Sequence, residues 1–321
     1  ETAPRSGRGA LGDTVVSGHD LNILAKRVAL GVFRAFQNAI FPSRCLVCGV
    51  YFNPQQTDDL HPETVDRRHI EGDPPGNGAT PDPARSVLGN GSLKAYFEVL
   101  LAPYVCHGCL GGFRPIRYPY CSMCGVVFKS REDTAHLCGD CIRRPKAYYR
   151  ARAAGLYTPG FMELLHQFKY RGKIQLAGPL GTLLLAAFQQ HWNADDFDMI
   201  VPVPLHKKKM RERGFNQTLL LVDGWGRSAG VPHGYRVNIP VEKTALARIR
   251  QTVPQTGLGR AARQRNIKRA FQVPAPEQIK AKRILLADDV FTTGATAGEC
   301  ARVLLKEGAE RVDVLTLARA V

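Results

Sequence analysis

The stretch RILLADDVFTTGATAGEC, residues 283–300, decides the fold of this chain. Its first residues form an unbroken apolar run, which is typical of a short strand buried on both faces of a parallel sheet. Asp288 and Asp289 end that run, and a loop of small residues follows before a helical pattern begins. Ligands of open α/β sheets bind at the carboxyl ends of the strands. The stretch therefore predicts a strand, a loop and a helix that bring two carboxylates to a binding edge.

The loop after the two aspartates has the composition of a phosphate cradle. It consists of Thr292, Thr293, Gly294, Ala295 and Thr296. Backbone N–H groups, threonine hydroxyls and a helix N-terminus together favour a bound anion. Carboxylates beside such a cradle suit a sugar phosphate, because they can bind ribose hydroxyls while the loop binds the 5′-phosphate. The sequence thus predicts a sugar-phosphate site at this loop.

The segments around this stretch predict further α/β units. Helical spacing of apolar residues and short apolar strands alternate along the second half of the chain, which is typical of a parallel sheet flanked by helices. The expected helices cover 161–170, 176–190, 215–226 and 296–308, and the expected strands cover 198–204, 283–290 and 311–321.

The charge of the chain indicates a phosphate-bearing partner. The net charge is +16, and residues 202–271 hold fifteen Lys and Arg against three acidic residues. Such a concentration favours phosphate, either on a small molecule or along a nucleic acid. A solvated basic surface is the alternative.

Composition and hydropathy predict a soluble protein. Hydrophobic residues make up 44% of the 321 residues, which is enough for a sizeable core. No apolar run approaches the ~20 residues that span a bilayer. No stretch has the pattern of a signal peptide. We therefore expect a cytoplasmic protein without a membrane span.

Eight of the nine cysteines form CxxC pairs. One such pair is compatible with a redox motif, but four in one segment favour metal, and a disulfide framework suits short secreted chains. Two of the pairs are followed by a glycine, Gly49 and Gly125, which permits the left-handed backbone of a metal-binding turn. The order of the pairs favours two consecutive structural zinc sites: Cys45, Cys48, Cys106 and Cys109, then Cys121, Cys124, Cys138 and Cys141.

The alternative arrangement of the cysteines is a cross-braced one, in which the pairs alternate between the two sites. Thirteen residues separate the pairs of the second site, and 57 separate those of the first, so that an insertion must loop out. His107 and His136 lie close enough to be ligands, although surface histidines are the simpler interpretation. A closed all-thiolate site leaves no position for a reacting water, so the zinc is expected to be structural.

The composition divides the chain into four regions. Residues 1–18 form a polar, Gly-rich tail expected to be disordered, and residues 19–44 an amphipathic helix that packs on a neighbouring domain or, alternatively, lies on a membrane surface. Residues 45–147 are expected to form the double zinc ribbon, with a low-complexity insertion at about 51–91. Residues 148–321 complete the chain as the α/β domain.

The segment LLADDVFTTGAT, residues 285–296, closely resembles the 5-phosphoribosyl 1-pyrophosphate (PRPP) loop of type I phosphoribosyltransferases. Three further segments resemble the ComF/GntX group, a set of competence-associated, phosphoribosyltransferase-like proteins with an N-terminal cysteine ribbon. They are FPSRCLVCG (41–49), DMIVPVPLHKKKMRERGFNQT (198–218) and RIRQTVPQTGLGRAARQRNIKRAF (248–271). The resemblance implies a type I phosphoribosyltransferase fold, a parallel sheet flanked by helices, behind an N-terminal helix and a double zinc-ribbon module. The long insertion in the first ribbon departs from the family pattern.

The resemblance also implies roles for individual residues. Asp288 and Asp289 are the expected catalytic residues, which hold the ribose. The residues expected to contact pyrophosphate or to surround it with positive charge are Val203, Pro204, Leu205, His206, Lys209, Arg211 and Arg213, with Lys207 and Lys208 beside them. Arg248, Arg250, Arg263 and Arg265 match a flexible hood, Lys169 and Arg171 a family-typical basic pair, and Asn216 and Gln217 offer polar contacts. Cys300, by contrast, is expected to be a small buried hydrophobe.

Two kinds of function fit these features. The first is a phosphoribosyltransferase that uses PRPP and Mg²⁺, either in DNA uptake and natural competence, as the resemblance implies, or in nucleobase salvage. The second is a non-catalytic adaptor that senses a nucleotide and binds single-stranded DNA or competence proteins. The positive charge of residues 202–271 is compatible with either hypothesis. The sequence identifies no pocket for the substrate that would accept the phosphoribosyl group.

Overall fold

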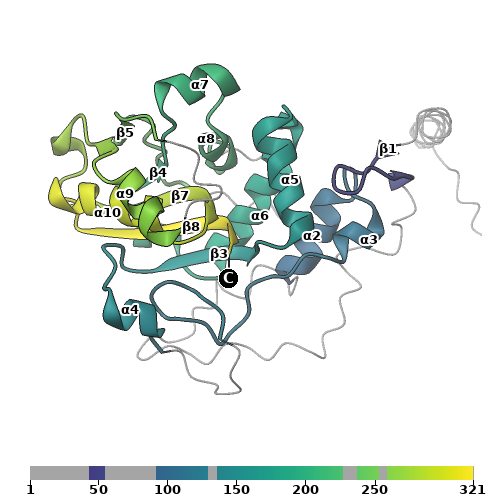
Figure 1. Ribbon diagram of the computed structural model, residues 1–321, viewed down its shortest axis with the longest axis horizontal. Coiled ribbons are helices and arrows are strands. Elements are labelled where there is room, and N and C mark those ends of the chain that lie inside the picture. The colour runs from purple at the N-terminus through teal and green to yellow at the C-terminus, as the bar shows by residue number, and fades with distance from the viewer. Residues whose placement is uncertain (1–42, 55–91, 129–135, 227–236, 253–258, 321) are drawn as a thin grey trace, which may run out of the picture.

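A computed structural model describes residues 43–54, 92–128, 136–226, 237–252 and 259–320 of the chain. The expected tail at 1–18, residues 19–42 of the helix expected at 19–44 and most of the expected insertion lie outside the described residues. The last two residues of that expected helix, Ser43 and Arg44, form a short strand instead. The α-helices and β-strands (Figure 1) are β1 (Ser43–Arg44), β2 (Tyr51–Phe52), α2 (Leu93–Leu101), α3 (His107–Leu110), α4 (Gly139–Arg143), β3 (Ala151–Leu156), α5 (Pro159–Tyr170), α6 (Ala177–Gln189), β4 (Met199–Pro202), α7 (Lys207–Arg213), α8 (Gln217–Val222), β5 (Ala247–Arg248), α9 (Arg260–Ile267), β6 (Phe271–Gln272), β7 (Arg283–Phe291), α10 (Ala295–Lys306) and β8 (Arg311–Arg319).

A four-stranded parallel sheet forms the centre of the molecule, in the order β3-β8-β7-β4. The two long strands β7 and β8 are central, with Leu286 opposite Val314. Both are rich in Leu, Ile and Val, which fit a pleated surface that is covered on both sides. The α/β class predicted from the sequence is therefore confirmed, with helices between successive strands.

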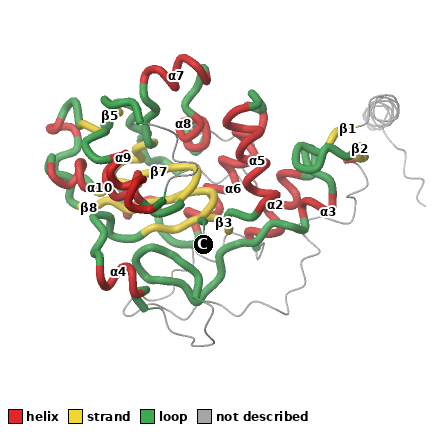
Figure 2. Tube along the Cα trace, viewed as in Figure 1, coloured by secondary structure: helices red, strands yellow, loops and turns green. Residues whose placement is uncertain are grey.

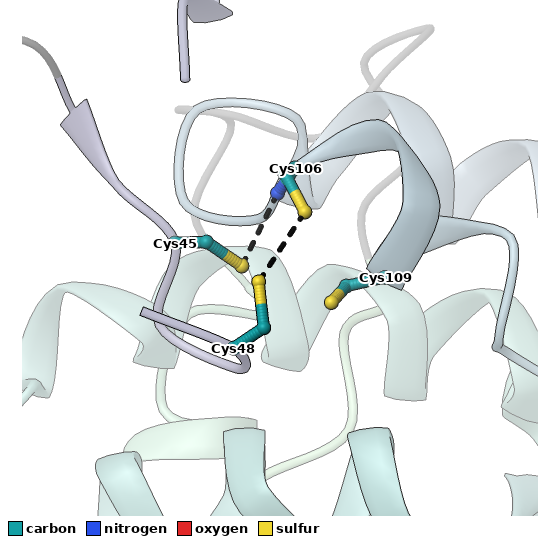
Figure 3. A group of neighbouring side chains, drawn as sticks. All are labelled: Cys45, Cys48, Cys106 and Cys109. Carbon is teal, nitrogen blue, oxygen red and sulfur yellow. Dashed lines mark hydrogen bonds between the residues drawn. The ribbon is translucent and has the colours of Figure 1, made fainter. Parts of the chain in front are cut away.

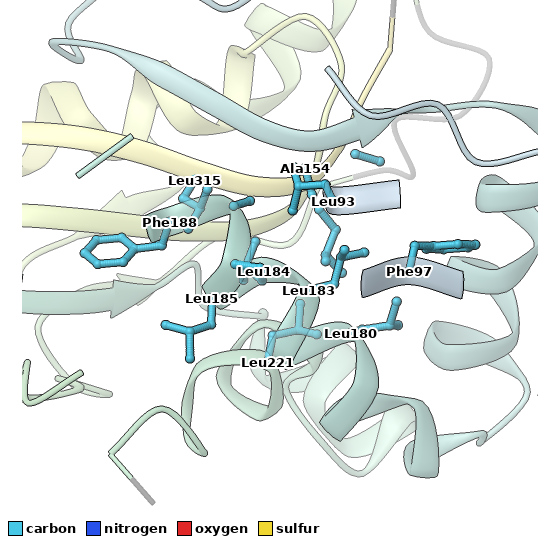
Figure 4. Close-up of a cluster of buried hydrophobic side chains, with 14 of the residues drawn as sticks. Leu93, Phe97, Ala154, Leu180, Leu183, Leu184, Leu185, Phe188, Leu221 and Leu315 are labelled. Atoms are coloured by element: carbon cyan, nitrogen blue, oxygen red, sulfur yellow. The ribbon is translucent and has the colours of Figure 1, made fainter. Parts of the chain in front are cut away.

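Alternate residues of β7 face two separate parts of the core. Leu285 and Ala287 lie in a cluster with α5, α6 and α8. Figure 4 shows this cluster around α6, with Leu184 and Phe188 near Leu315 of β8. Ile284 and Leu286 belong to the other cluster, which includes α10. The sheet is thus a middle layer with helices on both faces, and successive residues of β7 from Ile284 to Ala287 meet opposite faces.

The two helices that follow neighbouring strands β4 and β7 pack on opposite faces of the sheet. Leu221 and Val222 of α8, which follows β4, lie in the α6 cluster, whereas Cys300 and Ala301 of α10, which follows β7, lie in the other one. Ligands of open α/β sheets bind where successive connections diverge in this way. The loops after β4 and β7 therefore flank the expected binding crevice.

The segment between the two cysteine sites pairs with β3 at the edge of the sheet. Figure 2 draws the segment after α3 as loop, in green. Within it Pro115 forms an antiparallel bridge with Gly155 of β3, and the Leu156 N–H donates to the Arg114 carbonyl at 2.7 Å. Phe113 stacks on Phe97 of α2, with ring centroids 4.1 Å apart. The N-terminal half is thus joined to the sheet by backbone pairing and by aromatic packing.

Gly155→Ala is expected to destabilise the protein by about 2 kcal/mol, because overpacking costs about 1–3 kcal/mol. A Cβ at this position would lie 2.5 Å from the Phe113 ring. Gly178→Ala in α6 is the matched control, because a Cβ there meets nothing within 4 Å. Thermal unfolding of both variants checks this, and an unchanged melting temperature for Gly155→Ala would contradict it.

The opposite edge of the sheet is covered as well. Ile200 of β4 forms a parallel bridge with Val241, and its N–H donates to the Pro240 carbonyl at 2.8 Å. The Glu242 N–H donates a hydrogen bond to the Ile200 carbonyl at 2.9 Å. Short non-strand segments therefore line both outer strands. Among the described residues, no helix has the length and hydropathy needed to cross a membrane.

Candidate functional site

The first cysteine site joins a knuckle after β1 to the start of α3. Figure 3 shows Cys45 and Cys48 on the knuckle facing Cys106 and Cys109. All four sulfurs lie within 4.8 Å of one another, and Cys48 Sγ is 3.7 Å from Cys106 Sγ. The Cys106 N–H donates to Cys45 Sγ at 3.4 Å.

The second site repeats this geometry. Cys121, Cys124, Cys138 and Cys141 also lie within 4.8 Å of one another, and the Cys138 N–H donates to Cys121 Sγ at 3.3 Å. In both sites the third cysteine is the N-cap of a short helix, α3 or α4. The consecutive arrangement expected from the order of the pairs is therefore the one found, and the cross-braced alternative is excluded. In Figure 1 the two sites lie well apart, with α3 at the right and α4 at the lower left.

The geometry of both sites fits zinc. Tetrahedral Zn–S bonds of about 2.3 Å place two sulfurs about 3.8 Å apart. Cys48 Sγ lies 3.7 Å from Cys106 Sγ in the first site, and Cys124 Sγ lies 3.8 Å from Cys138 Sγ in the second. Burial opposes the charge on Cys45, but N–H donors from Cys106, Cys48 and Val47 outweigh it and lower its pKa to about 7. A set of four thiols with N–H donors aimed at the sulfurs is what a structural zinc ion requires.

Gly49 and Gly125, which follow the first CxxC pair of each site, have the left-handed backbone conformation that the sequence predicted. Gly49 has φ +76° and Gly125 φ +69°, both in the left-handed region. Each donates its N–H to the backbone carbonyl of the first cysteine of its knuckle, Cys45 at 3.0 Å and Cys121 at 2.9 Å. His107 and His136 are exposed and belong to neither four-cysteine group, and His136 stacks on Phe128 instead.

The loop after β7 turns into α10 through Gly294. This residue has φ +72° and caps the helix, and a Cβ on it would lie 2.6 Å from the Phe291 ring. Only glycine combines the positive φ with this close approach. Thr293 accepts a hydrogen bond from the Ala295 N–H at 3.3 Å. The five loop residues, 292–296, are half-buried, so their hydroxyls and amides stand at the rim of the sheet rather than inside it.

The two aspartates lie on opposite faces of β7, which is a departure from the expected arrangement. The strand continues to Phe291, so Asp288 and Asp289 are strand residues and their side chains alternate. Asp289 shares the face of Leu285 and Ala287, and Asp288 that of Leu286. The structure therefore does not place the two carboxylates side by side.

Asp289 is held in a buried network. Its side chain is 8% exposed, and Lys169 Nζ of α5 lies 2.9 Å from its Oδ1. Gln217 Nε2 of α8 donates to its Oδ2 at 2.8 Å. Gln217 in turn accepts from Arg213 of α7, whose guanidinium stacks on the Tyr170 ring at 4.9 Å. The Asp289 carboxylate thus connects β7 to α5 and α8 directly and to α7 through Gln217.

Asp288 has a different environment. It accepts a hydrogen bond from the Asp289 N–H at 2.9 Å, and Arg248 of strand β5 is a neighbouring charge. Burial and the charge of Asp289 raise the pKa of Asp288 to about 7. A nearby cation or hydroxyl donors would stabilise the charged form of a carboxyl group with such a raised pKa. Asp288 is therefore better suited than Asp289 to contact a ligand.

The loop after β4 stands next to the loop after β7. Val203 continues the pairing by donating its N–H to the Ala287 carbonyl at 2.9 Å, and its own carbonyl accepts from Asn216 at 3.2 Å. Pro204 and Leu205 are half-buried. His206 is the N-cap of α7 and accepts from the Lys208 N–H at 3.3 Å. The two loops assigned to phosphate groups therefore leave adjacent strands.

The structure brings some of the predicted basic residues together and not others. Burial and the positive charges of Arg248, Arg213 and Lys169 lower the pKa of Lys209, so these side chains share one region. Arg211 is exposed, as are Lys207, Lys208 and Arg171. Arg250 donates to the carbonyls of Asn266 and Lys268, both at 2.7 Å.

A connection that sequence reasoning missed runs from the second cysteine site to the loop. Arg319, at the end of β8, donates to Cys124 Sγ at 3.4 Å, and its guanidinium lies 4.6 Å from the Phe291 ring centroid. That ring packs under Gly294. Phe291 also meets Tyr148 edge to face. No local sequence signal marks Arg319, because its partners lie far away in the chain. Cys300 is fully buried, as the sequence predicted.

Comparison with solved structures and family models adds little. No family model matches the chain. The glutamine PRPP amidotransferase from B. subtilis, complexed with ADP and GMP, is 20% identical and matches with a TM-score of 0.27. That match covers 44% of this chain and 25% of the amidotransferase chain. A TM-score so low has no weight in assigning the site.

Comparison with known sequences gives longer matches. The DNA utilization protein YhgH of Salmonella typhimurium (strain LT2) is 31% identical over 235 residues, which covers 69% of this chain and 99% of that protein. Competence protein F of Haemophilus influenzae is 29% identical, over 67% of this chain and 90% of its own length. Competence protein ComFC of Bacillus subtilis is 27% identical, over 70% and 88%. With two four-cysteine sites ahead of a parallel α/β sheet, this chain belongs to the family of YhgH and the competence proteins F and ComFC.

Proposed function

We propose that the protein binds PRPP with Mg²⁺ between the loops after β4 and β7 and acts as a phosphoribosyltransferase in the handling of incoming DNA. One observation carries the proposal. A phosphate-type loop and a group of half-buried basic side chains come together at the point where the connections of neighbouring strands diverge. Relatives named for competence and DNA utilization support the cellular role.

Each part of the site has a role in this proposal. Residues 292–296 hold the 5′-phosphate through hydroxyls and amides, and Asp288 accepts from ribose hydroxyls. Lys209, Arg213 and Arg248 stabilise the negative charge that develops on the departing pyrophosphate, which is the main requirement when a ribose cation forms. Asp289 keeps Lys169 and Gln217 in place behind the loop. Bound Mg²⁺ would neutralise pyrophosphate oxygens, as hard cations do with few protein ligands.

The test is a direct assay of turnover. The zinc-loaded protein is incubated with PRPP, Mg²⁺ and a panel of nucleobases, and released pyrophosphate is measured together with PRPP binding by calorimetry. We expect Lys209→Ala to weaken PRPP binding by roughly 10-fold, since a charge-assisted hydrogen bond contributes about 1.5–3 kcal/mol. Lys207→Ala, an exposed neighbour on the same helix, is the control and should change little. Equal losses in both variants, or no PRPP binding by the wild type, would contradict the site.

A non-catalytic adaptor that binds single-stranded DNA is the second candidate. The charge of residues 202–271 favours it, and Lys207, Lys208 and Arg211 lie exposed on α7. If α7 contacts phosphates, oligonucleotide affinity should fall steeply with salt, and each neutralised contact should reduce the slope by about 0.7 for a single strand. Measurement of the slope for the wild type and for Lys207→Ala/Lys208→Ala decides this. No detectable binding at low salt would remove the candidate.

A further inference from the structure

The two cysteine sites share one geometry but differ in their access from solvent. Cys48 of the first site is exposed, and Cys106 and Cys109 are partly exposed (Figure 3). In the second site three of the four cysteines are buried, and Cys138 is partly exposed. Oxidation and alkylation of a cysteine follow its thiolate character and its exposure. A reagent in solution therefore reaches the first site more easily than the second.

The two sites also differ in the charge that faces their sulfurs. Arg319, at the end of β8, is 7% exposed and donates through its Nη2 to Cys124 Sγ at 3.4 Å. Among the described residues, the donors to the sulfurs of the first site are backbone N–H groups. Arg44, which lies beside the first knuckle, donates instead to the Gly49 carbonyl at 2.9 Å. Within the part of the chain that the structure describes, a cationic donor to a sulfur is thus found at the second site alone.

A cationic donor changes the reactivity of a metal-binding thiolate. Four thiolates around one divalent cation leave an excess of negative charge on the sulfurs, which keeps them nucleophilic. A guanidinium that donates to one sulfur offsets part of this charge, and outer-shell partners of this kind typically change metal affinity by roughly 10–100-fold. Arg319 should therefore make Cys124 a weaker nucleophile and a more firmly held ligand than Cys48.

We propose that the first cysteine site is a peroxide-sensitive zinc site with Cys48 as its reactive thiolate, and that Arg319 keeps the second site inert. The Cys48 sulfur attacks one oxygen of the peroxide, the O–O bond breaks, and the other oxygen leaves as hydroxide. The Cys106 thiolate, with its Sγ 3.7 Å away, then attacks the sulfenic acid and expels a second hydroxide. Two thiolates thereby give two electrons to the peroxide, and the resulting disulfide no longer binds the metal. This inference does not depend on the proposed function.

Access and charge, and not the distance between sulfurs, decide the order in which the two sites react. Cys124 Sγ and Cys138 Sγ lie 3.8 Å apart, so the second site has an equally close pair. The ninth cysteine, Cys300, is fully buried on α10. Oxidation of the first site would change how the knuckle after β1 is joined to α3. It would leave the contact between Arg319 and Cys124 in place.

The experiment adds hydrogen peroxide to the full zinc-loaded chain and follows the release of zinc with a chromogenic chelator. Free thiols are then blocked with N-ethylmaleimide, and peptide mass spectrometry identifies the oxidised cysteines. We expect one zinc per chain to leave at least about ten-fold faster than the other, with Cys48 and Cys106 joined in a disulfide. Release from both sites at one rate, or oxidation of Cys124 or Cys138 before Cys48, would overturn the proposal.

Arginine variants test the role of Arg319 separately. Arg319→Met removes the cation and should accelerate zinc release from the second site about ten-fold, whereas Arg319→Lys keeps a cation and should remain slow. Arg152→Met is the matched control and should leave the rate unchanged, because Arg152 donates to the Ser122 carbonyl of the same knuckle at 3.0 Å. Equal acceleration by Arg319→Met and Arg152→Met would overturn the role of the charge.

Zinc content and melting temperature, measured before oxidation, establish that each variant folds. The order of release in the wild type tests the proposal even if a variant fails to fold. A second site that releases its zinc first in the wild type contradicts the proposal whatever the variants show.

Discussion

Asp289→Asn is expected to destabilise the protein by about 3 kcal/mol, because removal of one partner of a buried ion pair leaves the other charge uncompensated. Lys169 is 11% exposed at its side chain and lies 2.9 Å from Asp289. Burial opposes its charge, but Asp289 outweighs this and raises the pKa of Lys169. The Asn variant keeps the shape and loses the charge. Urea unfolding at pH 7.5 measures the difference.

Asp288→Asn, the substitution at the neighbouring residue, should change stability in the opposite direction and make the protein more stable. The pKa of Asp288 is raised from 3.8 to about 7, so the folded state holds a proton there that the unfolded chain has released. Wild-type stability therefore falls as pH rises from about 4 to about 7 and is level above that. The Asn variant escapes this loss and should be more stable above pH 7, on the order of 2 kcal/mol for a half-buried group.

The two aspartate variants together test the assignment of roles. The difference between Asp288→Asn and wild type should shrink to nothing near pH 4, whereas the Asp289→Asn loss should persist at pH 7 and above. Lys169→Met combined with Asp289→Asn should cost less than the sum of the two single changes, because no charge is then left unpaired. Equal destabilisation by both Asn substitutions would show that the two side chains share one environment.

Loss of zinc from the second cysteine site is expected to weaken PRPP binding about ten-fold, a typical coupling between sites. Cys141→Ser removes one thiolate of that site and should release one zinc per chain. Without the metal Cys124 is no longer held in place, and its contacts with Arg319, and through Arg319 with Phe291 and the loop at Gly294, are weakened.

Cys109→Ser is the matched substitution in the first site. It should also release one zinc per chain, but PRPP affinity should change little, because the first site packs on α2 and α5 instead of on the loop. Metal analysis and calorimetry on the two variants give the comparison. Affinity that falls equally in both would mean that the loss comes from general destabilisation.

Much of the fold could be predicted from the sequence because its signals are local. The strand at 283–291, the helices at 159–170 and 295–306 and both cysteine sites follow from apolar runs, helical spacing and CxxC pairs with trailing glycines. Strand β3 was missed, since ARAAGL has small residues and no β-branched ones to mark a strand. The antiparallel pair of β5 and β6 was missed because its strands have two residues each.

The site was less predictable, since its arrangement depends on distant contacts. The motif around Asp288 and Asp289 marks the loop correctly as the edge of the sheet, but strand parity separates the two carboxylates. The partners of Asp289 come from α5 and α8, about 120 and 72 residues away in the sequence. Arg319 meets Cys124 across 195 residues. Such contacts leave no periodic pattern in a single sequence.

The covering of β3 by Arg114 to Ile116 bears on how the chain can be divided. An outer strand with free N–H and C=O groups is a template for another chain, and proteins cover such strands to prevent self-association. Here the cover comes from between the two cysteine sites. A shortened protein starting near residue 148 would uncover that strand and also lose the Phe113 packing, so it should self-associate. The half of the chain that carries the cysteine sites thus protects an edge strand from pairing with another copy of the chain.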